Sequence, residues 1–441
     1  MRKHLICYFL FLLLFITYSC DKPMHDKKVF ITVENGQFIK DGKPYYYVGT
    51  NFWYGAILGS EGEGGNRERL IAELDSLSSI GVDNLRILVG ADGANGITSK
   101  VEPALQTAPG VYNDTILAGL DFLLSEMGKR KMYAVLYLNN SWEWSGGYSQ
   151  YLEWAGYGKA PIPAVDGWDT FQNYVKQYQQ CDTCKTMFAE HVKFIVSRTN
   201  RYTNKPYAED PAIMSWQIGN EPRAFSPDNK VLYALWIQSV ASQIKNLDPN
   251  HLVSVGSEGY QGCEGDIKLW ELAHSYTEVD YMTIHIWPYN WGWAKKDDLK
   301  NTLEYSKEQT GIYIRQHVDI AQKHNKPLVI EEFGFPRDDF QFAIGTPTQC
   351  RDEYYSYVFD YVLNGFQNNG VLAGANFWAW GGSAKQSKDH VFWKKGDDYT
   401  GDPAQEEQGL YSVFQSDSTK EIVKQFNLKM NPNNNSEEVK L

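Results

Sequence analysis

Common signatures of function are missing from this sequence of 441 residues. It has no H-E-x-x-H zinc motif, no phosphate-binding loop of the Walker type and no dinucleotide-binding glycine fingerprint. The glycine-rich stretch Gly59 to Asn66 lacks the lysine of a phosphate loop, and we interpret it as a loop leading into a helix near Arg67. We therefore expect neither a metal nor an organic cofactor.

Positive charge is also scarce. There are 42 Lys and Arg residues against 54 Asp and Glu, which gives a formal net charge of −12. Because nucleic-acid binding needs clustered Lys and Arg, we expect no nucleic-acid partner. An acidic chain suits a neutral ligand such as a polysaccharide, and we expect a monomer.

The chain has one long apolar run, over residues 5–16, which follows a basic start. The run is too short to span a bilayer comfortably, so we interpret residues 1–20 as an export signal that lies outside the fold. The segment FITYSCDK resembles a bacterial lipoprotein box, although Thr17 stands where Leu is usual. The resemblance implies that Cys20 is lipid-modified and anchors the exported protein to the outer membrane. Free secretion after cleavage is the alternative.

Cysteine is rare beyond the signal. Four remain in the exported chain: Cys181, Cys184, Cys263 and Cys350. Export permits disulfides, but the spacing does not determine the pairing. The C-x-x-C beginning at Cys181 has no second pair, which argues against a zinc site.

What the sequence does have is an alternation of eight short apolar runs with helix-like segments. Continuous apolar runs followed by amphipathic helices are typical of parallel strands covered by helices. Eight units predict an α/β fold, a (β/α)8 TIM barrel with long loops at its C-terminal face; a doubly wound open sheet is the alternative. The runs begin near Tyr45, Val82, Lys131, Ala212, His251, Tyr281, Pro327 and Gly374.

We expect one catalytic domain over residues 29–430. It follows a short tether, residues 21–28, and precedes a polar C-terminal tail, residues 431–441. Asn-Gly and Asp-Gly turn signals between residues 30 and 50 predict a small β-hairpin before the barrel.

Polar and aromatic residues end the apolar runs, and in a barrel these positions meet at the C-terminal face. The set includes Asn51, Trp53, Arg86, Asn139, Asn140, Asn220, Glu221, Glu258, His285, Trp287, Glu331, Glu332, Trp378 and Trp380. Such a set is typical of a cleft floor, and no such residue is needed to hold a barrel together.

Two carboxylates stand out, Glu221 after the fourth run and Glu332 at the end of the seventh. Strands four and seven face each other across a barrel, so these side chains are expected to converge. Glycosidic cleavage needs one protonated and one ionised carboxyl group. We expect burial and the neighbouring charge to raise the pKa of the acid, and donors such as Arg86 to lower the other. Glu331 is a rival to Glu332; because side chains alternate along a strand, one of the pair should face the helix layer.

WQIGNEP (216–222) together with VIEEFG (329–334) resembles glycoside hydrolase family 5, and the likeness extends over residues 30–426. The resemblance implies that Glu221 is the acid/base and that Glu332, not Glu331, is the nucleophile of a retaining enzyme. It also implies that five further residues bind substrate: Arg86, Asn220, His285, Trp287 and Trp378.

Three segments, TIHIWPYNWGW, GTNFWYG and NNSWEWSGG, resemble the endo-β-1,4-mannanase subgroup. The implied function is endo-hydrolysis of internal β-1,4 linkages in mannan, glucomannan or galactomannan. Alternatives are a β-1,4-glucanase, an exo-acting β-mannosidase or mannobiohydrolase, and, more remotely, a glycan-binding lipoprotein without activity. Arg223 either contacts the product side or forms a salt bridge. Further candidates for substrate binding are Trp53, Asn140, Trp142 and Trp144.

The longest predicted loop, residues 140–210, is rich in aromatic side chains. We expect two or three of them to touch sugar and the others to pack the loop. The seven are Trp142, Trp144, Tyr148, Tyr151, Trp154, Tyr157 and Trp168. His274 and His324, in helix-like segments, are expected at the surface.

Overall fold

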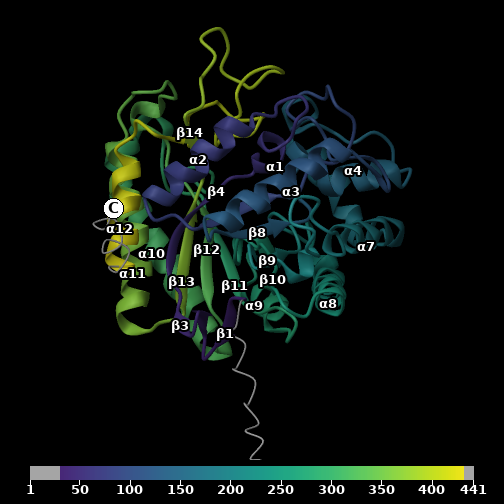
Figure 1. The fold of residues 1–441 in the computed structure, drawn as a ribbon, viewed down its shortest axis with the longest axis horizontal. Helices are drawn as coiled ribbons and strands as arrows, with labels where there is room; N and C mark the ends of the chain where they lie inside the picture. The colour runs from purple at the N-terminus through teal and green to yellow at the C-terminus, as the bar shows by residue number, and fades with distance from the viewer. Residues whose placement is uncertain (1–29, 432–441) are drawn as a thin grey trace, which may run out of the picture.

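The computed structural model describes residues 30–431, and its centre is a barrel of eight parallel strands (Figure 1). Their order is β10-β9-β8-β5-β4-β13-β12-β11. Backbone hydrogen bonds from Asp280 N to Val253 O (2.9 Å) and from His285 N to Glu258 O (3.0 Å) join β11 to β10 and close the barrel. This confirms the (β/α)8 barrel and excludes an open sheet. The strands are β4 Tyr47–Asn51, β5 Asn84–Leu88, β8 Tyr133–Tyr137, β9 Ile213–Gln217, β10 Leu252–Ser254, β11 Met282–Ile286, β12 Leu328–Phe333 and β13 Leu372–Phe377.

A helix follows each barrel strand and covers its outer face. In α3, the Asn113 side chain accepts a hydrogen bond from the Thr115 N–H (3.0 Å) and begins the helix. The buried residues Ile116, Leu120 and Leu124 recur every fourth position, which directs one face of α3 to the barrel. The eight helices are α2 Arg67–Ser79, α3 Asp114–Lys129, α7 Asp182–Val196, α8 Lys230–Leu247, α9 Ile267–Ser275, α10 Leu299–His324, α11 Gln349–Asn368 and α12 Thr419–Met430.

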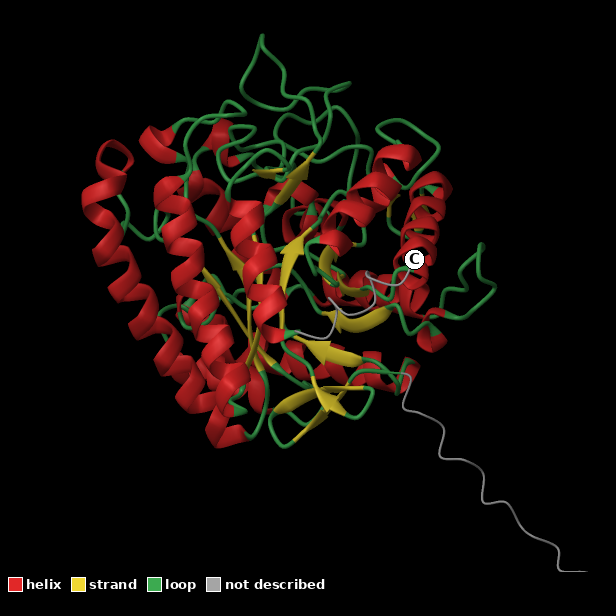
Figure 2. Cartoon of the chain, turned by 60° about the vertical axis from the view of Figure 1, so that its left-hand side comes forward, coloured by secondary structure: helices red, strands yellow, loops and turns green. Residues whose placement is uncertain are grey.

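The predicted N-terminal hairpin is present but has a third strand. The strands β1 (Thr32–Glu34), β2 (Gln37–Lys40) and β3 (Lys43–Pro44) form an antiparallel sheet. Both turns have positive φ at each central residue (53° and 75° at Asn-Gly, 51° and 76° at Asp-Gly), as tight hairpin turns require. The sheet lies at the end of the barrel opposite the long loops (Figure 2), where Phe38 is buried against Tyr281.

Long connections gather at the other end of the barrel (Figure 2). They contain the short helices α1 (Gly55–Leu58), α4 (Gly147–Trp154), α5 (Pro163–Asp166) and α6 (Trp168–Val175) and the strands β6 (Gln106–Ala108), β7 (Val111–Tyr112), β14 (Trp380–Gly382) and β15 (Val413–Phe414). Between residues 30 and 431, no helix combines the length and the apolarity that a membrane span needs.

The structure places two cysteines and two histidines whose pairing or burial was predicted incompletely or wrongly. Cys181 and Cys184 form a disulfide at the start of α7, while Cys263 and Cys350 are free. His324 is half-buried and pairs with Glu271 (2.7 Å). The expected surface position of His274 is wrong: it is fully buried, with Nδ1 2.8 Å from the Trp270 carbonyl oxygen. It lies on the face of α9 that packs against the barrel, and the hydrogen bond satisfies its ring there.

Candidate active site

The structure brings the two predicted carboxylates together around one histidine. Glu221 lies in the loop after β9, and Glu332 is on β12. His285 Nδ1, on β11, is 2.8 Å from Glu221 Oε1 and 3.3 Å from Glu332 Oε2. One oxygen from each carboxylate and one nitrogen of the histidine all lie within 4.8 Å of one another. Two carboxyl groups, one from the loop after β9 and one from β12, thus face a common point at the C-terminal end of the barrel.

Arg86 lies fully buried beneath Glu332 and donates a hydrogen bond to its Oε1. Its other donors reach Gln217 Oε1 (2.8 Å), Asn220 Oδ1 (2.8 Å) and Asn51 Oδ1 (3.1 Å). A buried guanidinium is tolerated only when it is paired in this way. Arg86 therefore supplies fixed positive charge to the carboxylate and orients Asn220 beside it.

Glu221 has an unusual backbone and a crowded side chain. Its φ is +50°, which is rare for a residue other than glycine and is typical of functional sites. Oε1 meets His285, and Oε2 accepts a hydrogen bond from the indole N–H of Trp142. The local geometry therefore aims both oxygens into the cleft, with a defined partner on each.

The expected rise in the pKa of the acid is wrong for this arrangement. Burial acts to raise the pKa of Glu221, but the hydrogen bond and charge of His285, with Arg223 and Trp142, outweigh it and lower that pKa. Burial acts to lower the pKa of His285, but Glu332 and Glu221 raise it to about 9. A cationic imidazole of His285 between the carboxylates was not predicted from the sequence.

Glu331 does not face the helix layer, contrary to expectation. A β-bulge in β12 pairs Ile284 with Ile330 and His285 with Glu332, so Glu331 is skipped. Its carboxylate accepts hydrogen bonds inside the barrel from Gln217 Nε2 (2.5 Å) and the Tyr281 hydroxyl (3.1 Å). It lies below the catalytic pair and does not line the cavity.

Above the carboxylates is a cavity of about 480 Å³, within the range of small-ligand sites. Six of the predicted substrate-binding residues line it: Asn220, Arg223, Trp142, Trp144, Trp287 and Trp378. Arg86 and His285 lie beneath its floor and contact the two carboxylates. Of the seven aromatic residues in the 140–210 loop, Trp142, Trp144 and Trp168 reach the cavity, while Tyr148 and Tyr151 are buried in the loop's own core.

Trp53 and Asn140 are placed behind the lining rather than in it. The indole N–H of Trp53 donates to the Gly401 carbonyl (2.8 Å), and the ring packs edge-on against Trp144. Asn140 donates to Ser145 Oγ (2.8 Å) and accepts from the Trp142 N–H (3.0 Å). Both side chains are almost fully buried, so the structure gives them a supporting position in place of the predicted contact with substrate.

Arg223 forms the salt bridge considered for it and also lines the cavity, while its contact with the product side stays a prediction. Its Nε donates to Glu258 Oε2 (2.7 Å), and its guanidinium lies 5.1 Å from the centre of the Trp142 ring while it lines the cavity. Burial raises the pKa of Glu258 to about 7, with Glu221 adding to the rise and Arg223 opposing it. Glu258 is not among the predicted substrate-binding residues, and its position at a strand end is the one signal in the sequence that points to it.

Three further residues that line the cavity lie after β13 and belong to no recognised sequence motif. They are Gln405, Glu406 and Tyr411. Burial raises the pKa of Glu406 well above its usual range, and the charges of Asp402 and Glu332 add to this. Tyr411 packs edge-on against Trp287 (5.3 Å). Gly334, in the Glu-Phe-Gly motif, permits this packing, because a Cβ there would lie 2.8 Å from Trp287 and 2.9 Å from Tyr411.

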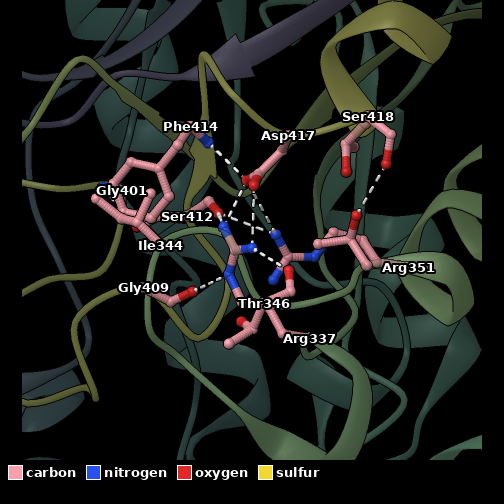
Figure 3. A network of polar contacts seen from close by, with 12 residues as sticks. Arg337, Ile344, Thr346, Arg351, Gly401, Gly409, Ser412, Phe414, Asp417 and Ser418 are labelled. Carbon is pink, nitrogen blue, oxygen red and sulfur yellow. Dashed lines mark hydrogen bonds and ion pairs between the residues drawn. The ribbon is translucent and has the colours of Figure 1, made fainter.

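A buried polar cluster anchors this segment (Figure 3). Arg337 donates to Asp417 Oδ1 (3.0 Å) and to the Gly409 carbonyl (2.9 Å). Arg351 donates to the carbonyl oxygens of Ser412 (2.9 Å) and Phe335. Both arginines are fully buried, and together they tie the chain between residues 409 and 417 to the loop after β12. The position of Glu406 and Tyr411 is therefore set from both sides.

Glu221, His285 and Glu332 are close enough to share a cation. Their hydrogen bonds fit an acid–base site, because His285 Nδ1 lies 2.8 Å from Glu221 Oε1 and 3.3 Å from Glu332 Oε2. Arg86 and Trp142 already donate to the two carboxylates. The donors around the three side chains thus fit an ion-paired acid–base site.

Comparison with known proteins identifies the family. Residues 28–435 match the family model described as "GH family 5 beta-mannosidase-like". A glycoside hydrolase family 5 mannosidase from Rhizomucor miehei is 32% identical, with a TM-score of 0.84 over 92% of this chain and 98% of that one. A putative mannan endo-1,4-beta-mannosidase 9 from Oryza sativa subsp. japonica is 29% identical over 78% of this chain and 82% of that protein. An endo-beta-1,4-mannanase from Thermotoga petrophila shares the fold (TM-score 0.64, 22% identity, covering 89% and 78%). The chain belongs to glycoside hydrolase family 5, in its β-mannosidase-like group, and is a glycoside hydrolase.

Proposed function

We propose that the chain is a retaining β-mannanase that cleaves β-1,4-mannosidic linkages of mannan, glucomannan or galactomannan by double displacement. The observation that supports this most directly is the separation of Glu221 and Glu332, whose nearest ligand oxygens lie within 4.8 Å. Retaining glycosidases hold their carboxyl groups about 5–5.5 Å apart, whereas inverting enzymes need about 6.5–9.5 Å to admit a water.

In the first step Glu332 attacks the anomeric carbon while Glu221 gives a proton to the leaving oxygen, so the glycosidic bond breaks as the Glu332–sugar bond forms. In the second step Glu221 takes a proton from water, whose oxygen replaces Glu332 at that carbon. Arg86 donates a hydrogen bond to Glu332 and holds it oriented for the attack. No metal or organic cofactor enters either step.

The proton for the first step is held by the pair of Glu221 and His285. The pKa of His285 is raised to about 9, so the pair keeps one proton through neutral pH. That proton lies on a 2.8 Å hydrogen bond between His285 Nδ1 and Glu221 Oε1. Transfer of that proton from His285 to Glu221 leaves a neutral imidazole and a protonated Glu221. The protonated carboxyl group is the form that can give a proton to the leaving oxygen.

Endo action is the first candidate, since curated relatives such as that from Oryza sativa are named for it. Exo action is the second, and one observation favours it: Gln405 and Glu406, from the long connection after β13, line the cavity close to Glu332. A loop that narrows the glycone side would admit only a chain end. A mutant of the Rhizomucor miehei mannosidase was crystallised with mannosyl-fructose, a short ligand.

Two measurements test the proposal. Proton NMR during hydrolysis of a β-mannoside should show the β-anomer first, and initial appearance of the α-anomer would overturn retention. The sizes and rates of release of products from galactomannan, glucomannan and carboxymethylcellulose distinguish endo from exo action and a mannanase from a glucanase. Early long manno-oligosaccharides mean endo action, a single short product means exo action, and faster release from carboxymethylcellulose would favour a β-glucanase.

Export and anchoring also form part of the proposal. Cys20 and the rest of the predicted signal, tether and tail lie outside the described residues, so the support is the N-terminal sequence alone. A lipid at Cys20 would hold the enzyme at the outer membrane. The remote alternative, a binding protein without activity, is disfavoured because both carboxylates are present and share His285.

A further inference from the structure

The cavity has two chemically different sides. On the acid/base side, Trp142 donates to Glu221, and Arg223 lies over the Trp142 ring and pairs with Glu258. On the nucleophile side, Trp287 packs against Trp378 and Tyr411, and the charge of Glu332 helps to raise the pKa of Glu406. In a retaining reaction the acid protonates the leaving oxygen, so the acid/base side receives the leaving part of the substrate.

Trp168 is a second indole on that side, next to Trp142. It begins helix α6, it lines the cavity, and 55% of its surface is exposed. Its ring centre lies 5.8 Å from that of Trp142 at an angle of 88°, so Trp168 is one indole ring farther from Glu221 than Trp142 is. An indole of this size left open to solvent at the rim of a cavity is typical of a binding surface.

The rest of α6 fixes this ring in place. Phe171 is fully buried, packs edge-on against Trp168 (6.0 Å) and stacks beside Trp142 (6.2 Å). Gln172 lies one helical turn after Trp168, so both side chains share a face of α6, and both line the cavity. The face therefore offers an aromatic plate and, next to it, an amide that can donate and accept hydrogen bonds.

We propose that Trp168 and Gln172 form an outer subsite for the leaving part of the substrate, which takes the second sugar beyond the cleaved bond. The pyranose face lies on the indole, and Gln172 binds a hydroxyl of the same ring. Because Trp142 contacts both Glu221 and Trp168 and separates them, a leaving group of one sugar or one aryl ring does not reach the subsite. The proposal rests on the proposed reaction at Glu221 and Glu332, but it holds for endo and exo action alike.

The test compares Trp168→Ala with Trp168→Phe and with Tyr157→Ala. Tyr157 is a matched control, an aromatic residue of the same loop that is 44% exposed and does not line the cavity. Each variant is assayed on an aryl β-mannoside and on manno-oligosaccharides of two to six units, and its melting temperature is checked first. For Trp168→Ala we expect kcat/KM on the longer oligosaccharides to fall about tenfold, mostly through KM, with little change on the aryl mannoside.

Trp168→Phe should recover part of the loss, and Tyr157→Ala should behave as the unmodified enzyme. Equal losses on short and long substrates, or no loss on either, would overturn the subsite. If the unmodified enzyme does not hydrolyse mannans but cleaves another β-glycan, the proposed substrate fails. The same length series in that glycan then tests Trp168 independently.

Discussion

His285 and Glu221 form a hydrogen-bonded pair in the floor of the cleft, with Nδ1 2.8 Å from Oε1 and both side chains buried. Glu332, on β12, also faces this nitrogen, with its Oε2 at 3.3 Å. Each group changes the pKa of its neighbour, raising that of His285 and lowering that of Glu221. The acid–base chemistry of the site is therefore a property of the group and not of one carboxylate.

The first prediction concerns stability and pH. The pKa of His285 rises from about 6.5 in the unfolded chain to about 9 in the folded protein. A raised pKa means that this stabilisation is fully present below pH 6.5 and is lost as pH increases toward 9. Thermal unfolding of the unmodified protein and of His285→Asn between pH 6 and 9 should show the two curves converging as pH rises.

Three other buried histidines, His191, His274 and His317, have lowered pKa values and oppose this trend, but they are present in both proteins. The difference between the two curves thus isolates His285. A difference that stays constant over this range would show that His285 is neutral when folded.

The second prediction separates the two carboxylates. Glu332→Ala should lower kcat by roughly 10³-fold or more on every substrate, because no bond to the sugar can form. Glu221→Ala should lower kcat/KM about 10²- to 10⁴-fold on mannan but little on a dinitrophenyl mannoside, whose leaving group needs no proton. On the dinitrophenyl mannoside kcat should still fall, because Glu221 is also the base of the second step. Azide should give an α-mannosyl azide with the first variant and a β-mannosyl azide with the second. The opposite pattern would exchange the two roles.

The third prediction concerns Trp142, whose N–H stabilises the ionised form of Glu221. Trp142→Phe keeps an aromatic ring and removes the donor, so the pKa of the acid should rise. The alkaline limb of the kcat/KM profile should move to higher pH. Trp144→Phe is the control, since Trp144 lines the same cavity without a hydrogen bond to Glu221. Equal movement in both variants would contradict the assignment.

The fourth prediction tests the anchor of the segment that carries Glu406 and Tyr411. Asp417→Asn leaves the fully buried Arg337 without a charged partner, which should cost about 3–5 kcal/mol in the free energy of unfolding. Glu61→Gln removes the pair with Arg67, in which Glu61 is 75% exposed, and should cost at most about 1 kcal/mol. Denaturant unfolding measures both, and similar losses would refute the importance of burial.

The fifth prediction concerns location. Cys20→Ser removes the thiol that would take the lipid, so the protein should move from the membrane fraction to the soluble fraction and should lose incorporation of labelled palmitate. Catalytic activity of the purified protein should be unchanged. Palmitate labelling that survives the substitution would exclude Cys20 as the anchor.

Much of the fold was predictable because its information is local. Each barrel strand is a continuous apolar run covered by a helix on one side and the barrel interior on the other, and the eight runs marked all eight strands. The hairpin turns were predictable for a similar reason, since Asn-Gly and Asp-Gly favour the positive φ observed there. The convergence of Glu221 and Glu332 followed from strand count alone.

Other features depended on contacts that no local pattern reports. Alternation along β12 predicted that Glu331 faces the helices, but a β-bulge turned it into the barrel toward Gln217 and Tyr281. The spacing of residues in α9 alone did not predict that His274 lies on the buried face of this helix. Glu406 has no motif of its own, and only the folded connection after β13 brings it to the cavity near Glu332.

The amino-acid sequence was enough to predict the barrel, the ends of its strands and the two carboxylates. Hydrophobic periodicity marks each strand, and the parallel arrangement brings the strand ends to one face of the barrel, so no long-range contact had to be known. Tertiary structure alone decided the protonation pattern and the lining of the cavity. Both depend on which charges and rings are brought within a few ångströms of each other by segments far apart in the chain, as His285 is between Glu221 and Glu332.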